Sequence, residues 1–183
     1  MKVIKAKTAG FCFGVKRAVD TVYKQVDTKC GQIYTYGPII HNEEVIKDMR
    51  DKGVIVLRSE EDLDMISQGT VIIRSHGVEK RIYEKIEQKG LRIVDATCPF
   101  VKKIHNIVSE KSGEGFHIII IGNPEHPEVV GIKGWAKDNV TVIQSAEDAE
   151  CFTADRKEKI CIVSQTTFNY NKFKDLVEII MKK

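Results

Sequence analysis

Gly10-Phe11-Cys12-Phe13-Gly14-Val15-Lys16-Arg17-Ala18-Val19 is the stretch that decides the fold, because a strand pattern gives way to a helix pattern within it. Before it, Val3–Lys7 alternates in the manner of a β-strand, and after it apolar residues recur at helical spacing to about Asp27. Cys12 is therefore expected in a glycine-bracketed turn between strand and helix, where the helix dipole favours a thiolate. The alternative interpretation of Cys12 is a small buried hydrophobic side chain in a tight turn.

The same pattern occurs a second time, which favours a functional role for the cysteine. Cys98-Pro99-Phe100-Val101-Lys102-Lys103 repeats the stretch that begins at Cys12, 86 residues further along the chain. His41-x-Glu43-x-Val45 returns as His126-x-Glu128-x-Val130, and two further strand-bearing segments recur in the same order. Four matches at nearly one spacing predict an α/β fold made of two duplicated small domains with mostly parallel sheets.

The repeat also predicts the domain organisation. We expect the first domain at residues 1–97 and the second at residues 98–183. At the same period a third copy would open with its own cysteine near residue 184, directly after Lys183. We therefore expect these residues to form two thirds of a three-part protein.

Composition places the chain among ordinary globular proteins. Its 183 residues are 30% charged and 42% hydrophobic, with a formal net charge of +3. The dispersed lysines do not favour a nucleic-acid partner, and the longest apolar run, Ile118–Ile121, is too short to span a membrane. Five cysteines without close pairing argue against a disulfide framework and favour a reducing, cytoplasmic location.

Periodicity predicts strands and helices that alternate along both domains. Besides Val3–Lys7, strands are expected at Gln32–Tyr36, Val54–Leu57, Thr70–Ile73, Arg92–Ala96, Phe116–Ile121, Val140–Ile143 and Lys159–Ser164. Helices are expected after Cys12, after Asn42, at Glu60–Ile66, at Glu79–Gln88, from Pro99, from Glu128 to Trp135 and around Phe173–Ile180.

Reactive side chains follow the ends of these strands. They are Cys12, His41, His76, Cys98, His126, Glu128 and Thr166. Because the carboxyl ends of parallel strands meet at one edge of a sheet, we expect these side chains to gather on one edge of each domain.

The two repeated cysteines suit iron or zinc. Cys12 and Cys98 are too far apart for a CxxC motif, but thiolates placed alike by a duplication can meet at a shared axis. Three of them, one from each copy, would hold three corners of an iron–sulfur cubane and leave the fourth iron open to a substrate oxygen. Zinc held by Cys12, Cys98 and a histidine is the competing interpretation. Cys161 is expected in the core, and Cys30 and Cys151 at loop or helix ends.

Histidines and one glutamate complete the candidate site. His41, His76 and His126 are expected to donate hydrogen bonds to an anionic ligand, and the alternative for each is a histidine whose ring is hydrogen-bonded to the backbone. Glu128 is expected to deliver a proton, with the Thr166 hydroxyl orienting the carboxyl group. The alternative for Glu128 is a helix-start carboxylate favoured by the dipole, which is also how we interpret its counterpart, Glu43. Structural or solvated positions are expected for His105, His117, Lys16, Arg17, Lys102 and Lys103.

Six motifs together resemble one enzyme family. They are Gly10-Phe11-Cys12-x-Gly14-Val15, Gly37-Pro38-Ile39-Ile40-His41-Asn42, Ser75-His76-Gly77-Val78, Asp95-Ala96-Thr97-Cys98-Pro99, Gly122-x-x-x-His126-Pro127-Glu128-Val129 and Ser164-Gln165-Thr166-Thr167. In this order, from the first residues nearly to the last, the chain is similar to the hydroxymethylbutenyl diphosphate reductases. These enzymes complete the non-mevalonate route to isoprenoids.

The resemblance implies a reductive dehydroxylation of 4-hydroxy-3-methylbut-2-enyl diphosphate at a [4Fe-4S] cluster. Ferredoxin or flavodoxin would supply the electrons, and isopentenyl and dimethylallyl diphosphate would be the products. The resemblance implies Cys12 and Cys98 as cluster ligands, and Glu128 as the proton source supported by Thr166. It also implies diphosphate contacts from His41, His76 and His126. The three-domain trefoil of this family agrees with the expected third copy.

The family's third domain has no counterpart in these residues. In the family it carries the third cluster cysteine and a serine and asparagine set that grips the diphosphate. We therefore expect this chain alone neither to hold a stable cubane nor to turn over substrate. The alternative of a different class is a non-catalytic metal- or anion-binding module, and self-association through an exposed apolar domain face is a further alternative.

Overall fold

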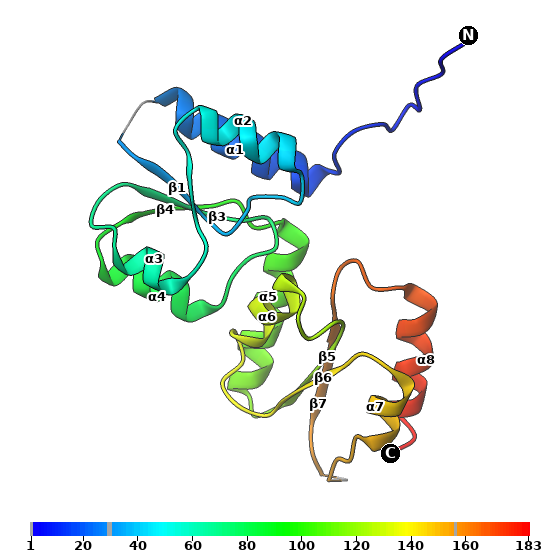
Figure 1. Cartoon of the computed structure of the whole chain (residues 1–183). Helices are drawn as coiled ribbons and strands as arrows, with labels where there is room; N and C mark the ends of the chain where they lie inside the picture. Colours follow the sequence, from blue (N-terminus) through cyan, green and yellow to red (C-terminus); the bar gives the residue numbers. More distant parts are fainter. Residues whose placement is uncertain (1, 29–30, 156) are drawn as a thin grey trace. The chain divides into compact units, whose positions relative to one another are not determined.

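The computed structural model describes residues 2–28, 31–155 and 157–183, which form two compact units (Figure 1). Unit 1 comprises Met1–Ser75 and Leu91–Cys98, and unit 2 comprises His76–Gly90 and Pro99–Lys183. The contacts thus divide the chain differently from the expected boundary at residues 97 and 98, because the segment after β3 groups with unit 2. The expected limits of the duplicated repeat stay a prediction.

Unit 1 contains a four-stranded parallel sheet with the strand order β2-β1-β3-β4. Its strands are β1 (Ile33–Tyr36), β2 (Ile55–Leu57), β3 (Thr70–Ile73) and β4 (Arg92–Asp95). Tyr36 aligns with Leu57 on one side and with Ile73 on the other, so three strands end at one level. All four residues of β3 are buried, as an interior parallel strand covered on both faces requires.

The helices of unit 1 are α1 (Phe13–Thr28), α2 (Glu43–Asp51) and α3 (Glu60–Asp64). Val22 of α1 and Met49 of α2 share one buried cluster with Ile33 and Ile72 of the sheet, so both helices pack on the same sheet face. Asn42 begins α2, because its side chain accepts a hydrogen bond from the Val45 backbone N–H at 3.0 Å. The helix expected after Asn42 is confirmed.

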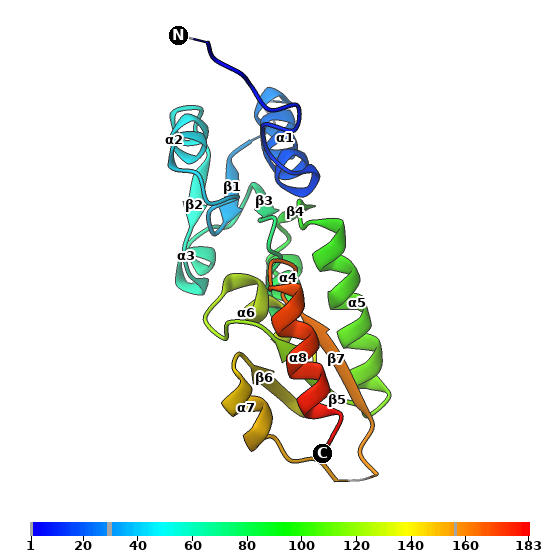
Figure 2. The ribbon, with the colours of Figure 1, turned by 90° about the vertical axis from the view of Figure 1, so that its right-hand side faces the viewer.

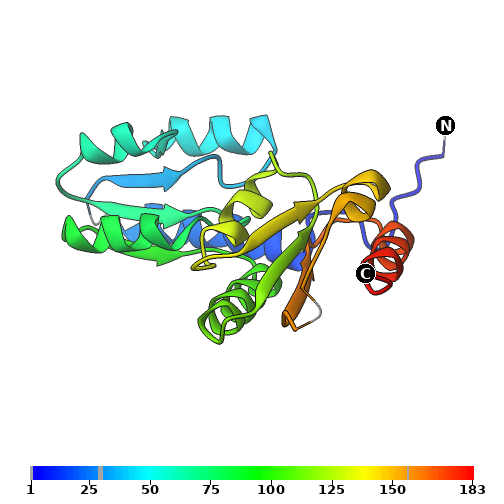
Figure 3. The same ribbon diagram turned by 90° about the horizontal axis from the view of Figure 1, so that it is seen from below.

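Unit 2 contains a three-stranded parallel sheet with the order β6-β5-β7, whose strands lie side by side in Figure 3. Its strands are β5 (His117–Ile121), β6 (Val140–Ile143) and β7 (Ile160–Ser164). The central strand β5 carries four fully buried isoleucines that alternate between the sheet faces. Ile119 and Ile121 pack with Leu176 and Ile180, while Ile118 and Ile120 pack with other residues, Val108, Val129 and Ile132 among them.

This alternation explains the layers of unit 2, in which helices cover both faces of the sheet (Figure 2). The helices are α4 (Lys80–Gln88), α5 (Pro99–Gly113), α6 (Pro127–Lys133), α7 (Ala146–Cys151) and α8 (Tyr170–Ile180). Helices α5 and α6 cover one face, and α7 and α8 cover the other. None of the helices in the part of the chain that the structure describes is long and apolar enough to cross a membrane.

The strand expected at Val3–Lys7 is wrong. Residues 2–7 form no strand, and the side chains of Val3 and Ile4 are 81% and 79% exposed. An alternating pattern shows that a segment suits a sheet face, but a strand also needs a neighbour for its backbone hydrogen bonds. Neither sheet includes this segment, so Cys12 does not follow a strand.

One helix was not expected from the periodicity. Helix α7 is only six residues long, too short for a helical repeat to show. Its start is nevertheless marked, because Ser145 and Asp148 form a reciprocal capping box. Ser145 is the repeat counterpart of Ser59, the N-cap of α3, whose side chain accepts a hydrogen bond from the Asp62 backbone N–H.

Candidate functional site

In unit 1, both repeated cysteines lie beside the start of α1. Cys12 is exposed and directly precedes α1, while Cys98 is half-buried, lies three residues after the end of β4 and directly precedes α5. A Cβ atom added to Gly14 would lie only 2.6 Å from the Cys98 Sγ atom, so this thiol rests against the α1 backbone. Glycine at position 14 is therefore what lets the Cys98 thiol approach α1 close to Cys12.

Two further contacts hold Cys98 in this position. Its backbone N–H donates to the Ser75 carbonyl at 2.9 Å, which ties the loop after β4 to the loop after β3. The Ser75 hydroxyl in turn donates to the Ile39 carbonyl at 3.0 Å. The chain segments that follow three neighbouring strands are thus connected by hydrogen bonds beneath the thiol.

Arg17 does not lie on a solvated helix face as expected. Its guanidinium donates to the carbonyl oxygens of Thr97 and Asp95 at 2.8 and 3.3 Å, and the side chain is half-buried. No periodic pattern in the sequence indicated this role, because the two carbonyl groups lie 80 and 78 residues further along the chain. Lys16, Lys102 and Lys103 are exposed, as expected.

The arrangement in unit 1 fits part of a metal cluster. Cys12 and Cys98 are both free thiols, and two thiolates beside the start of one helix suit two ligand positions of an iron–sulfur cluster. Among residues 2–28, 31–155 and 157–183, no group of three or more histidine, cysteine or acidic side chains could hold a metal ion. A cubane would need a third protein thiolate or a substitute ligand, and the zinc alternative likewise lacks a histidine grouped with both thiols.

In unit 2, a buried glutamate is held by a threonine that follows the neighbouring strand β7. Glu128 lies at the start of α6 and its residue is only 2% exposed. The Thr166 backbone N–H donates to Glu128 Oε1 at 2.6 Å, and the Thr166 hydroxyl donates to Oε2 at 2.8 Å. Both carboxylate oxygens are therefore fixed, while Thr166 itself is exposed at the end of β7.

A backbone hydrogen bond fixes the tautomer of the neighbouring His126 ring. It is the N-cap residue of α6, and its Nδ1 atom accepts a hydrogen bond from the Glu128 backbone N–H at 3.1 Å. Because Nδ1 accepts, the ring proton must lie on Nε2, which leaves Nε2–H as a donor. The rings of His76 and His126 meet edge to face, with centroids 5.6 Å apart.

The structure therefore brings the expected residues together within each unit. Unit 1 joins Cys12 and Cys98 at α1, and unit 2 joins His76, His126, Glu128 and Thr166 by successive contacts. His41 lies in unit 1, exposed in the loop between β1 and α2.

The remaining candidates are mostly structural, as expected. His105 is buried and stacks on Trp135 with ring centroids 5.0 Å apart, and His117 bonds Glu158 and Thr141. Cys161 is half-buried in β7, and burial raises the pKa of its thiol. Cys151 is exposed at the end of α7 and Glu43 is exposed at the start of α2, whereas Cys30 lies outside the described residues.

Gln165 is a site residue that the strand-end pattern did not single out. Its amide oxygen accepts a hydrogen bond from the Asn123 backbone N–H at 3.2 Å, and its amide nitrogen donates to the Thr167 hydroxyl at 2.7 Å. It thereby joins the loop after β5 to the loop after β7, beside Thr166. Its position between a buried strand and two threonines was the available signal.

Comparisons with known proteins give a consistent result over the chain. The profile of the LytB protein family matches residues 3–183. A 4-hydroxy-3-methylbut-2-enyl diphosphate reductase of Thermoanaerobacter sp. is 48% identical over 185 residues, and one of Caldanaerobacter subterraneus subsp. tengcongensis is 45% identical over 184 residues. Each alignment covers 100% of this chain and 63% of the relative, so the chain spans about 63% of the length of these relatives.

Solved structures agree. The E-1-hydroxy-2-methyl-but-2-enyl-4-diphosphate reductase of Plasmodium falciparum superposes with a TM-score of 0.89 at 30% identity, covering 96% of this chain and 55% of that one. A second solved structure, of an (E)-4-hydroxy-3-methyl-but-2-enyl diphosphate reductase, gives a TM-score of 0.83 at 38% identity and covers 98% of this chain and 63% of that one.

Proposed function

The chain belongs to the LytB protein family, and on this premise we propose that it forms part of a reductase acting on 4-hydroxy-3-methylbut-2-enyl diphosphate. The reaction would remove the allylic hydroxyl group as water and yield isopentenyl and dimethylallyl diphosphate. The names of relatives that align with the whole chain support this proposal. The activity is proposed for a protein that includes more than these residues, since the chain spans about 63% of those relatives.

The observation that carries the proposal is the buried Glu128 carboxylate with both oxygens bonded to Thr166. A carboxyl group used in proton transfer needs a fixed direction and a route to the substrate. The Thr166 hydroxyl offers that route, because with a proton on Glu128 the hydrogen bond reverses: the hydroxyl then accepts from the carboxyl group and turns its own proton outward. We assign Glu128 as the proton source and Thr166 as the group that links it to the substrate hydroxyl.

The histidines supply the anion contacts in this proposal. The Nε2–H of His126 is a donor whose orientation is set by the cap at Nδ1. His76 packs against that ring and His41 stands in the exposed loop after β1, and we assign all three to the substrate diphosphate. The Nε2–H donor that the cap leaves on His126 suits a phosphate oxygen.

Cys12 and Cys98 would hold two iron atoms of a [4Fe-4S] cluster. When bound, such a cluster supplies electrons one at a time and an iron that accepts the substrate oxygen. The close approach of Cys98 to Gly14 supports this assignment, since nothing in the packing of a small core thiol requires it. Ferredoxin or flavodoxin is the proposed electron donor.

The cluster assignment is tested by anaerobic reconstitution of the 183-residue chain with iron, sulfide and a small external thiol. The external thiol can stand in for a third protein ligand. We expect iron and acid-labile sulfide to approach about four each per chain, with a broad visible absorption, only when both cysteines are present. Cys12→Ser and Cys98→Ser should each lose most of the iron, and Cys151→Ser is the matched control that should retain it.

Two results would contradict the assignment. Iron that stays bound in both Cys12→Ser and Cys98→Ser would place the metal elsewhere in the chain. One zinc ion per chain, lost in the same variants and not displaced by iron and sulfide, would favour the metal-binding module. Without the external thiol we expect little iron and no turnover of substrate by this chain, since it supplies two of the ligands.

A further inference from the structure

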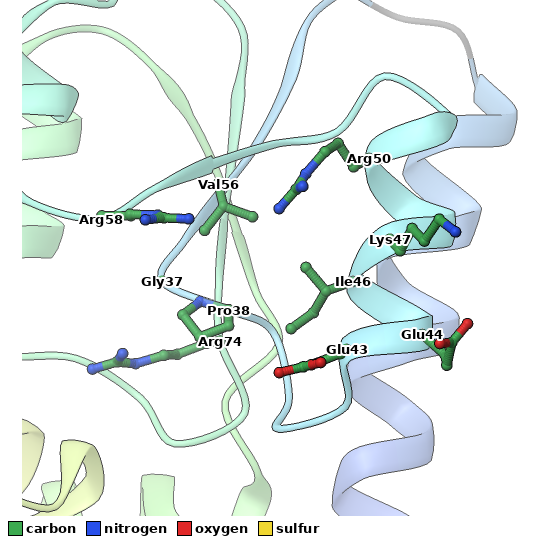
Figure 4. Close-up of a pocket in the computed structure, with 10 residues that line it drawn as sticks. All are labelled: Gly37, Pro38, Glu43, Glu44, Ile46, Lys47, Arg50, Val56, Arg58 and Arg74. Carbon is green, nitrogen blue, oxygen red and sulfur yellow. The ribbon is translucent and has the colours of Figure 1, made fainter.

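A pocket of about 590 Å³ opens in unit 1 between α2 and the edge strand β2 (Figure 4). Its apolar side chains are Pro38, Ile46 and Val56. This volume lies within the range of ordinary small-molecule sites. None of the residues that line the pocket has a role in the function proposed above.

Basic side chains surround this apolar floor. They are Lys47, Arg50, Arg58 and Arg74. In Figure 4 the side chains of Arg50 and Arg58 reach toward Val56 from opposite sides. Both arginines are exposed, so their guanidinium groups can reach a ligand without losing their own solvation first.

Acidic groups offset only part of this charge. Glu43 and Glu44 also line the pocket, and in Figure 4 the Glu43 side chain points toward it while that of Glu44 points away. In Figure 4 the Lys47 side chain also points away from the pocket, so Arg50, Arg58 and Arg74 against Glu43 leave a net positive charge at neutral pH. The pocket therefore favours an anion.

Arg74 is held in place by the backbone beside it. It directly follows the buried strand β3, and burial lowers the pKa of its guanidinium. A Cβ atom on Gly37 would lie 2.6 Å from Arg74 Nη1, and the φ of Gly37 is +72°. Only glycine adopts that conformation readily while leaving room for the guanidinium, so the cation is positioned by the fold.

We propose that this pocket binds a small organic anion that carries a diphosphate group and a short hydrocarbon part. Guanidinium groups bind phosphate oxygens through paired hydrogen bonds, and several of them on one rim suit a diphosphate better than a single carboxylate. Ile46 and Val56 offer the apolar surface that the hydrocarbon part would cover. This is a second anion site, distinct from the histidines assigned to the substrate.

The test is calorimetric titration of the 183-residue chain with isopentenyl diphosphate as the probe, and with inorganic pyrophosphate for comparison. In the Arg50→Ala/Arg58→Ala double variant, binding of isopentenyl diphosphate should weaken by about tenfold or more. Lys5→Ala/Lys24→Ala removes the same charge from exposed positions outside the pocket and should change the affinity by less than about twofold. His126→Ala should retain this binding, which separates the pocket from the proposed substrate site.

A second measurement does not depend on the variants. Methyl resonances of Ile46 and Val56 should shift on titration of the unmodified chain with isopentenyl diphosphate, and less with pyrophosphate. The proposal is overturned if the double variant binds as the unmodified chain does, or if only His126→Ala abolishes binding. Equal affinity for pyrophosphate would show that the hydrocarbon group of the ligand is not recognised. Unshifted methyl resonances of Ile46 and Val56 would show that the ligand does not bind in this pocket.

Discussion

Thr166 donates two hydrogen bonds to Glu128, one from its backbone and one from its hydroxyl, although the residues lie 38 positions apart. Glu128 begins α6 after β5, and Thr166 follows β7, the neighbour of β5 in the sheet. The pair therefore depends on parallel strands that end at the same level, with Ile121 aligned to Ser164.

Replacement of Glu128 by alanine should destabilise unit 2. The change removes a buried acceptor for two donors and should cost about 1–2 kcal/mol in the free energy of unfolding, measured by urea denaturation. Glu43→Ala removes the exposed repeat counterpart and should cost less than about 0.5 kcal/mol. Equal losses in the two variants would show that Glu128 is only a helix-start carboxylate.

A methyl group at position 14 should disturb the Cys98 thiol. Gly14→Ala would place Cβ 2.6 Å from Sγ, so either the side chain or α1 must move, at a cost of about 1–3 kcal/mol. Reconstituted iron should fall together with the melting temperature. Gly113→Ala, in α5 with open space around its Cβ position, is the matched control and should retain both. Normal iron content in Gly14→Ala would contradict the proposed ligand role of Cys98.

Two roles of His126 can be separated by substitution. His126→Ala removes the cap of α6 and should cost about 1 kcal/mol of stability, whereas His126→Asn supplies another capping side chain and should restore most of it. If the ring contacts a diphosphate, the asparagine variant should be stable and still bind substrate more weakly. Thermal melts with and without 4-hydroxy-3-methylbut-2-enyl diphosphate measure both effects, and full retention of ligand stabilisation in His126→Asn would refute the contact.

The capping box of α7 should make the free energy of unfolding depend on pH in the acidic range. Backbone N–H groups of Gln144 and Ser145 donate to the Asp148 carboxylate and hold its pKa below the ordinary value of 3.8. A lowered folded pKa adds stability above the unfolded pKa, and that stability is lost as pH falls through the folded value. The difference in urea midpoint between the unmodified chain and Asp148→Asn should therefore be present at pH 7 and shrink as the pH falls below the ordinary pKa of 3.8. Glu147→Gln, one residue earlier, should show a smaller and less pH-dependent difference; if it matches Asp148→Asn, the capping explanation fails.

Much of the fold follows from local pattern, because buried parallel strands and amphipathic helices leave a strong trace in sequence. Every strand from β1 to β7 lies within a segment expected from its apolar residues, such as the four isoleucines of β5. The failure at Val3–Lys7 has the opposite cause, since no local pattern shows whether a strand has a neighbour. Six-residue α7 was missed because so short a helix shows no repeat, although its cap was visible.

The residues of the candidate site could be predicted where the same motif occurs twice in the sequence. Cys12 and Cys98 were matched by their neighbours, and strand ends located His126, Glu128 and Thr166. Interactions that join distant segments through one side chain leave no periodic trace. Arg17, bonded to carbonyls 80 and 78 residues away, belongs to that class, and so does Arg74, whose partner in space is the turn at Gly37.

The path of the chain between β3 and β4 has a consequence for synthesis. The chain leaves unit 1 after Ser75, contributes His76–Gly90 to unit 2, and returns at Leu91 to add the edge strand β4. A ribosome must therefore release α4 before the first sheet can acquire its fourth strand, and the Tyr83 ring of α4 meets edge to face with Trp135, which is made later. No single cut separates the two units, and a fragment that ends near residue 97 would carry α4 without the rest of unit 2.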